Sequence, residues 1–166
     1  MGGPCYVKHQ DGRKSKGPPA TDNFQVIPFK FPLGSGVMWC SAEQCYQAQK
    51  GDPHTAGLIL DSKPFQESDS AYGNRIWRIG QQSECSSDWE DRKLEAMYLV
   101  NCAKYACNPS LHAELLATGD DELVGGPSTW EWSKYNGLIQ MAIRRMIREN
   151  VDLSSISVLD LAILEH

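Results

Sequence analysis

Four polar side chains between residues 39 and 50 have the types and the spacing to perform acid–base and nucleophilic chemistry. They lie at i, i+3, i+4 and i+7, so a helix would place all of them on one face: Glu43, Tyr46, Gln47 and Lys50. A carboxylate can exchange protons with a reacting group, and a neutral amine can attack an electrophilic carbon. Because the rest of this stretch is mostly small or apolar, the pattern indicates the wall of a polar cavity. A solvated helix face is the plainer alternative.

The helix that would present this face has recognisable ends. Ser41 is a good N-cap residue, and Gln44 three positions later completes a capping box. Glu43 then falls in the first turn, where the helix dipole favours a negative charge. Gly51 and Pro53 end the pattern, so the sequence predicts a helix over residues 41–50.

The rest of the chain predicts an α+β fold, a predominantly helical single domain with a small N-terminal β element. Residues 1–20 are rich in Gly, Pro and Lys and predict a flexible arm, whereas 23–32 predict one or two strands. Helices are predicted near 54–61, 88–107, 110–117, 137–149 and 152–166, and a short strand at 123–124. Residues 63–87 predict a long surface segment with one or two helical turns. The division is therefore an arm (1–20), a domain that holds the candidate site (21–150) and a helical extension (151–166).

Charge and composition exclude some classes of function. The 166 residues carry a formal net charge of −5, which argues against a general nucleic-acid binder but not against a pocket for one modified nucleotide. The six cysteines show neither Cys-x-x-Cys nor zinc-site spacing, so we expect reduced thiols, no metal and no cofactor. With no secretory segment or membrane-length apolar run in the sequence, we expect an intracellular location, cytoplasmic or nuclear.

Several motifs in order resemble those of the NADAR (YbiA-like) family. The strongest is Trp39-x-x-x-Glu43-x-x-Tyr46-Gln47-Ala-x-Lys50, which departs from the family pattern at Cys40 and Gln44, where Pro and His are usual. The resemblance covers about residues 22–148. It continues in Asp22-Asn23-Phe24, Trp89-Glu90-x-x-Lys93-x-x-x-Met97, Ala103-Lys104-Tyr105, Leu115-Leu116-x-Thr118, Leu123-Val124 and Met141-x-x-Arg144.

The resemblance implies an N-glycosidase that acts where ribose C1 is joined to an exocyclic amine. Lys50 would form an imine with C1, and Glu43 would act as general acid and base. This role requires a neutral Lys50, whose pKa burial must lower. In the alternative, Lys50 binds phosphate, Glu43 holds ribose hydroxyls, and water attacks an oxocarbenium-like centre.

Further side chains are candidates for binding the substrate, each with a structural alternative. Asn23 and Phe24 match a Ser-Asn-Phe motif of the resembled family, and Tyr46 and Gln47 share the face of Glu43. The remaining candidates are Trp89 as a pocket floor, Trp132 for stacking on a base, and Arg75, Arg78 and Arg144 for phosphate. A buried Trp and a solvated or salt-bridged Arg are the alternatives for these five.

One departure from the family bears on the substrate. The family usually has an Asp before an aromatic-Trp-Gly sequence, and here Thr129 falls at that Asp and Ser133 at the Gly. Glu131 could supply a replacement carboxylate. We therefore expect removal of ADP-ribose from guanine in DNA or RNA, or from a free ADP-ribosyl nucleotide.

Two alternatives of other kinds stay open. The first is cleavage of phosphoribosylamino-pyrimidine intermediates of riboflavin biosynthesis. The second is a non-catalytic module that binds ADP-ribose or an NAD derivative; a structural interaction domain is disfavoured by the polar helix face. The sequence indicates no membrane association and no stable protein partner.

Overall fold

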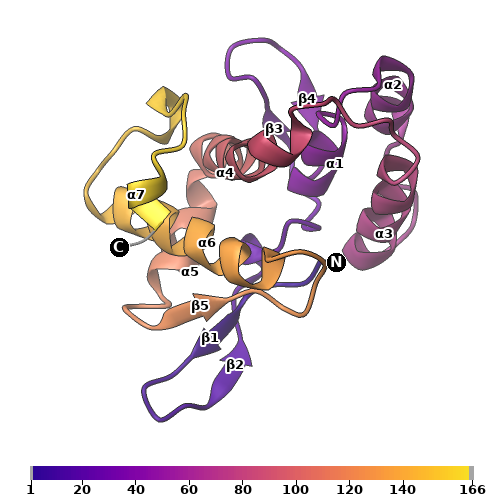
Figure 1. The fold of residues 1–166 in the computed structure, drawn as a ribbon. Coiled ribbons are helices and arrows are strands. Elements are labelled where there is room, and N and C mark those ends of the chain that lie inside the picture. Colours follow the sequence, from indigo (N-terminus) through magenta and orange to yellow (C-terminus); the bar gives the residue numbers. More distant parts are fainter. Residues whose placement is uncertain (1, 165–166) are drawn as a thin grey trace.

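The computed structural model describes residues 2–164 and confirms a helix-dominated α+β fold (Figure 1). The helices are α1 (Ala42–Gln47), α2 (Pro53–Asp61), α3 (Asp69–Gly80), α4 (Trp89–Cys107), α5 (His112–Leu116), α6 (Trp132–Arg148) and α7 (Leu161–Leu164). The 3₁₀ helices are η1 (Pro19–Thr21), η2 (Pro109–Leu111) and η3 (Leu153–Ser155). The strands are β1 (Tyr6–Lys8), β2 (Lys14–Lys16), β3 (Phe29–Lys30), β4 (Met38–Trp39) and β5 (Glu122–Val124).

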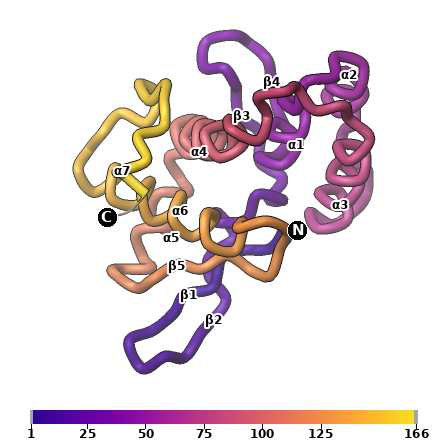
Figure 2. The backbone as a smooth tube through the Cα atoms, viewed as in Figure 1, coloured from indigo at the N-terminus to yellow at the C-terminus, as the bar shows by residue number. Residues whose placement is uncertain are grey.

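Two small antiparallel sheets accompany the helices. The first has the order β2-β1-β5, with Val7 opposite Ser15 on one side and Leu123 on the other. The second is the β3–β4 hairpin, which leads directly into α1. Figure 2 shows the β1–β2 hairpin reaching away from the helices, whereas the N-terminal end runs between α3 and the loop before α6. Because β1 pairs with β5, the start of the chain lies near the loop after β5.

The core lies mainly between α4 and α6. Tyr98 and Tyr105 of α4 and Ile139 and Ile143 of α6 are fully buried there. Gly137 lets α6 pack closely on β5, since a Cβ at this position would lie 2.0 Å from the main-chain oxygen of Leu123. This packing fixes the first turns of α6, which carry part of the site described below.

The beginning of α1 forms as the sequence predicts. The Ser41 hydroxyl accepts a hydrogen bond from the main-chain N–H of Gln44 at 3.1 Å. The Gln44 side chain reaches back to the N–H of Cys40 at 2.7 Å, one residue before the position expected in a capping box. Its amide also donates to the main-chain oxygens of Ile59 and Ser62, so the same residue ties α1 to the end of α2.

The structure differs from the expected elements at both ends. Instead of a flexible arm, residues 6–8 and 14–16 form the β1–β2 hairpin, whose first strand pairs with β5, and Cys5 and Val7 are buried. The pairing partner lies more than a hundred residues away, so local composition does not reveal it. The predicted helix over 152–166 is reduced to η3 and α7, and residues 165 and 166 lie outside the described residues.

Two internal elements also differ from expectation. The predicted surface segment over 63–87 contains the twelve-residue helix α3, which Ser68 caps by accepting from the N–H of Ala71. Its periodicity is hard to see because Gly73 and Gly80 occupy its inner face. Helix α6 begins at Trp132, not at Gly137, so Trp132 belongs to a helix instead of a loop. Across the described residues, no helix is both long and apolar enough to span a membrane.

Candidate active site

A small cavity of about 40 Å³ opens onto Glu43, and five candidate residues lie around it or form its wall. They are Asn23, Glu43, Tyr46, Gln47 and Trp132, drawn from the segment after η1, from α1 and from α6. The other lining residues are Gly2, Trp77, Met97, Ser128, Thr129 and Asn136. The fold thus brings the polar face of α1 together with the loop before α6.

Glu43 is held in a buried and well-defined position. Its side chain is 7% exposed, and burial raises the pKa of its carboxyl. The Gln47 amide donates to Oε1 of Glu43 at 2.6 Å, which lowers this pKa and offsets part of the effect. The main-chain N–H of Glu43 donates to the Asn23 oxygen at 2.9 Å. A carboxyl group in this state can hold a proton for transfer inside the cavity.

Helix α1 ends at Gln47, not at residue 50 as the sequence predicts, so Lys50 lies three residues beyond the helix. It does not line this cavity. It is half-buried, and desolvation lowers the pKa of its amine, although the nearby charges of Cys85, Glu43 and Glu90 act in the opposite direction. Within the described part of the chain its Nζ makes no hydrogen bond or ion pair. Its main-chain oxygen accepts from the N–H of Ser86 at 2.8 Å, which ties the segment after α1 to the segment before α4.

Aromatic rings form one side of the site. The Tyr46 ring lies 5.2 Å from that of Trp89 and 5.5 Å from that of Trp132. Trp132 reaches the cavity, but Trp89 is 3% exposed and packs behind Tyr46, so it supports the wall without forming a floor. Trp130 has a positive φ of 52° and stacks on Tyr135 at 4.9 Å, which pins the preceding loop to α6.

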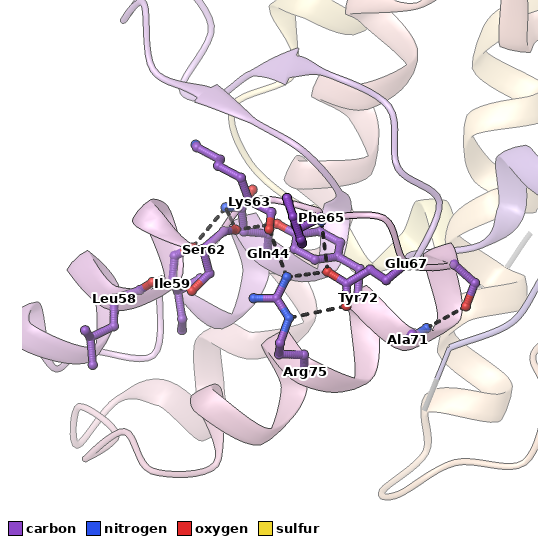
Figure 3. Close-up of polar contacts among 11 residues, drawn as sticks. Gln44, Leu58, Ile59, Ser62, Lys63, Phe65, Glu67, Ala71, Tyr72 and Arg75 are labelled. Carbon is purple, nitrogen blue, oxygen red and sulfur yellow. Dashed lines mark hydrogen bonds and ion pairs between the residues drawn. The ribbon is translucent and has the colours of Figure 1, made fainter.

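The three candidate phosphate-binding arginines do not line the cavity. Arg75 forms an ion pair with Glu67 and donates to the main-chain oxygen of Lys63 at 2.8 Å (Figure 3). It ties α3 to the segment before it, beside Tyr72, whose hydroxyl donates to the Ser62 oxygen. These contacts use the guanidinium to close a loop, so we assign Arg75 a structural role.

Arg78 and Arg144 are placed differently from one another. Arg78 is exposed near the end of α3. Arg144 is 5% exposed and donates to the Thr118 hydroxyl at 2.7 Å and to the Asp121 main-chain oxygen at 2.9 Å. It therefore holds the turn before β5.

Phe24 lies beneath a second, larger hollow of about 350 Å³. Its ring is tightly enclosed, since a Cβ at Gly2 or at Gly73 would lie little more than 2 Å from it. Gly2 lines both hollows, so they adjoin at the N-terminal segment. The larger hollow also contacts Tyr6 and Lys16 of the β1–β2 hairpin, the element that the sequence predicts to be a flexible arm.

Sequence reasoning missed several cavity residues. Trp77 and Met97 come from helices whose facing is set by packing, and Asn136 carries no motif. Thr129 lines the cavity where the family's Asp is expected, whereas Glu131 is exposed before α6 and does not line it. No group of three or more His, Cys, Asp or Glu residues in the described chain is arranged to hold a metal ion.

The profile of the NADAR domain matches residues 11–129, which is more than half of the sequence. The chain belongs to the NADAR family. The fold is similar to the NMR structure of Escherichia coli YbiA, with a TM-score of 0.65, 23% identity and 79% of each chain covered. At this identity the likeness to YbiA shows the fold alone.

Two curated relatives are similar over part of their length. One is the riboflavin biosynthesis protein VVA0006 of Vibrio vulnificus (strain YJ016), 39% identical over 89 residues, which are 54% of this chain and 23% of the relative. The other is the chloroplastic riboflavin biosynthesis protein PYRR of Zea mays, 27% identical over 154 residues, covering 82% of this chain and 24% of the relative. The chain thus spans about a quarter of the length of each.

Proposed function

We propose that this NADAR protein is an N-glycosidase that hydrolyses the bond between ribose C1 and an exocyclic amine. The observation that carries the proposal is that two pKa values shift in opposite directions. The pKa of Glu43, on α1, is raised, and that of Lys50, in the segment just after α1, is lowered. Burial favours the protonated carboxyl of Glu43 and the neutral amine of Lys50, which are the states that an acid and a nucleophile require.

The steps follow from these two states. In the ring-opened substrate an imine joins C1 to the base nitrogen, and the neutral Lys50 amine adds to C1. The base leaves as its free amine, and the two protons that Lys50 loses reach it by way of Glu43. Water then adds to the Lys50–C1 imine, so that the sugar is released with an aldehyde at C1 and the lysine amine is restored.

For the substrate, we propose an ADP-ribosyl group on guanine, in nucleic acid or in a free nucleotide. The cavity at Glu43 has a volume of about 40 Å³, whereas the adjoining hollow has about 350 Å³. Tyr6 is 41% exposed and can stack on a second base, and Lys16 can bind a phosphate. An ADP-ribosyl group has phosphates and a base beyond its reacting ribose, which supports this assignment.

A second candidate substrate is a phosphoribosylamino-pyrimidine of riboflavin biosynthesis. The names of the two curated relatives favour it, although the chain covers only about a quarter of each. This substrate has the same type of bond at C1, so the chemistry proposed for Glu43 and Lys50 is unchanged. It would not need the larger hollow.

The test is incubation with guanine-ADP-ribosylated DNA and, separately, with the phosphoribosylamino-pyrimidine, each with and without borohydride. Intact-protein mass spectrometry should show a reductant-dependent adduct in the wild type and none in Lys50→Ala. Lys63→Ala is the matched control, because Lys63 lies in the segment between α2 and α3 and does not line the cavity.

Each outcome separates one part of the proposal. Release of ADP-ribose with the adduct supports the enzyme and the imine route together. Release without an adduct keeps the N-glycosidase but assigns Lys50 to phosphate binding. Release from the pyrimidine alone selects the riboflavin-type substrate. If neither substrate is cleaved but ADP-ribose binds, the protein is a binding module.

A further inference from the structure

Four buried side chains and the half-buried Asn136 form a continuous hydrogen-bonded chain that runs from the core to the cavity. The Tyr105 hydroxyl donates to Gln140 Oε1 at 2.6 Å, and Gln140 Nε2 donates to Asn101 Oδ1 at 3.0 Å. Asn101 Nδ2 donates to Asn23 Oδ1 at 3.0 Å, and Asn23 Nδ2 donates to Asn136 Oδ1 at 3.1 Å. The last two residues, Asn23 and Asn136, both line the cavity at Glu43.

The direction of this chain is set by one main-chain group. Asn101 Nδ2 also donates to the main-chain oxygen of Met97 at 3.0 Å, and a carbonyl oxygen can only accept. The nitrogen of Asn101 must therefore face Met97 and Asn23, which turns the oxygen of Asn23 toward Asn101. The side-chain nitrogen of Asn23 then faces Asn136 and donates to its Oδ1, so this oxygen already has a partner.

What remains at the end of the chain is the amino group of Asn136. Its Nδ2 has no hydrogen-bond partner among the described residues, and the residue is half-buried, not enclosed. Turning the Asn136 amide over would set its nitrogen against the nitrogen of Asn23, leaving two donors facing each other. The buried chain therefore imposes one orientation on a side chain at the cavity surface.

We propose that Asn136 binds the substrate by donating from Nδ2 to one of its acceptor oxygens, and that Asn23, Asn101 and Gln140 position it. This rests on the proposed function, since the substrate would be the glycoside held at Glu43. The acceptor is an oxygen of the sugar or a carbonyl of the base. Asn23 also accepts from the N–H of Glu43 through its main-chain oxygen, so one residue links the acid and the donor.

Asn136→Asp tests the donor with little change of shape. Asn23 can still donate to the new carboxylate, but the group facing the cavity becomes an acceptor and repels an oxygen. We expect KM to rise about 10- to 100-fold, as for a lost hydrogen bond with an unpaired partner, with a smaller change in kcat. An unchanged KM would overturn the proposal.

Tyr105→Phe is the matched structural control. It removes the far end of the chain and leaves Gln140 Oε1 without its donor, so the protein should unfold at a lower temperature. Because Met97 and not Tyr105 sets the direction, KM should stay within about twofold of wild type. A rise in KM equal to that of Asn136→Asp would show that both variants act through general loosening.

Substrate analogues identify the acceptor and separate this inference from the proposed function. Each analogue lacks one sugar hydroxyl or one base carbonyl. For the analogue that lacks the true acceptor, KM should be raised with the wild type, and Asn136→Asp should raise it no further. If the wild type cleaves neither substrate, the proposed enzyme fails. Titration of free ADP-ribose by calorimetry still tests Asn136, and equal affinities of wild type and variant would then reject it.

Discussion

At the scale of single residues, burial makes Glu43 and Lys50 chemically different from an exposed Glu–Lys pair. The sequence spacing of the two is compatible with an ordinary surface helix face. In the structure Glu43 is enclosed and hydrogen-bonded to Gln47, whereas the Lys50 amine is half-buried and makes no hydrogen bond or ion pair with a described residue. The opposite pKa shifts follow from these surroundings and not from the residue types.

The raised pKa of Glu43 predicts a specific change in pH dependence for Glu43→Gln. In the wild type, activity should fall at high pH because Glu43 loses the proton that it must donate, and at low pH because Lys50 becomes charged. Gln cannot ionise, so the rate should be about 10²- to 10⁴-fold lower and should rise with pH to a plateau. Profiles of kcat/KM against pH check this.

A fall in kcat/KM at high pH that persists in Glu43→Gln would assign the alkaline limb to another group.

The free energy of unfolding depends on the pKa of Glu43 in its own way. Because the folded pKa of Glu43 is above its unfolded value, its contribution is fully present below the unfolded pKa and is lost as pH rises through the folded pKa. Glu43→Gln should therefore gain stability relative to wild type as the pH rises above the ordinary pKa of a Glu carboxyl.

At the scale of elements, the close packing of α3 on α1 shapes the site. Gly73 and Gly80, seven residues apart on α3, lie against Phe24 and Gln47. A Cβ at Gly80 would lie 2.0 Å from Gln47 Oε1, an atom that is buried without a hydrogen-bond partner. The two glycines thus leave room for Gln47, which holds Glu43, and for Phe24, which underlies the larger hollow.

Gly80→Ala should therefore impair activity more than folding. The Gln47 side chain can swing aside, so the protein should fold, but its hydrogen bond to Glu43 would be lost. A hydrogen bond between neutral groups contributes about 0.5–1.5 kcal/mol, so kcat/KM should fall about 2- to 10-fold. Gly57→Ala in α2 is the control, because nothing lies within 4 Å of a Cβ there. Equal kcat/KM values for the two variants would contradict this account.

Lys104 joins α4 to the segment that carries Asn23. It is fully buried, its Nζ donates to the main-chain oxygens of Ala20 and Asp22 at 2.9 Å, and burial lowers its pKa to about 8. Between pH 8 and 10.5 the unfolded chain holds this proton more tightly than the folded chain, so Lys104 adds stability as the pH rises. Lys104→Met lacks this gain.

Urea unfolding at pH 8 and pH 10 measures the effect. Lys104→Met should be less stable than wild type by about 1–3 kcal/mol at pH 8, because two buried carbonyls lose their donor. The difference in unfolding free energy should widen at pH 10. A difference in unfolding free energy that is the same at both pH values would mean that Lys104 carries the same charge in the folded and unfolded states. Lys14→Met, on the exposed strand β2, is the control.

At the scale of the whole molecule, the two hollows adjoin because distant parts of the chain meet. The larger one lies where the N-terminal segment, the β1–β2 hairpin, α3 and the loop after β5 come together. Among the described residues that line it, Lys16 alone is charged, in a chain whose net charge is −5. The net charge of the whole chain therefore does not exclude a local site for an anion.

Lys16→Gln distinguishes the two candidate substrates. If phosphate groups of ADP-ribose occupy the larger hollow, KM for an ADP-ribosyl guanosine should rise about tenfold and depend less on salt. Cleavage of the phosphoribosylamino-pyrimidine should be unaffected. Lys14→Gln, on the same strand but outside the hollow, controls for the loss of one charge. Equal KM values for the two variants would place the substrate elsewhere.

Local signals in the sequence predict much of the secondary structure and part of the site. Capping residues and periodicity predict α1, α2 and α4, and the spacing of Glu43, Tyr46 and Gln47 marks the polar face, because these signals act over a few residues. Lys50 was predicted on the same face but lies beyond the end of α1. The motif of the resembled family also pointed to Asn23 and Trp132, which line the cavity. By contrast, Arg75 and Arg144 were predicted to bind phosphate, but they make structural contacts.

Long-range packing settles which of these side chains meet and which protonation state is favoured for each. The pairing of β1 with β5, the facing of Asn136 and the enclosure of Glu43 depend on contacts between residues that are distant in the chain. Local sequence carries little information on such contacts, because many partners satisfy the same apolar pattern. Burial, which shifts the pKa values of Glu43 and Lys50, is likewise a property of the packed molecule.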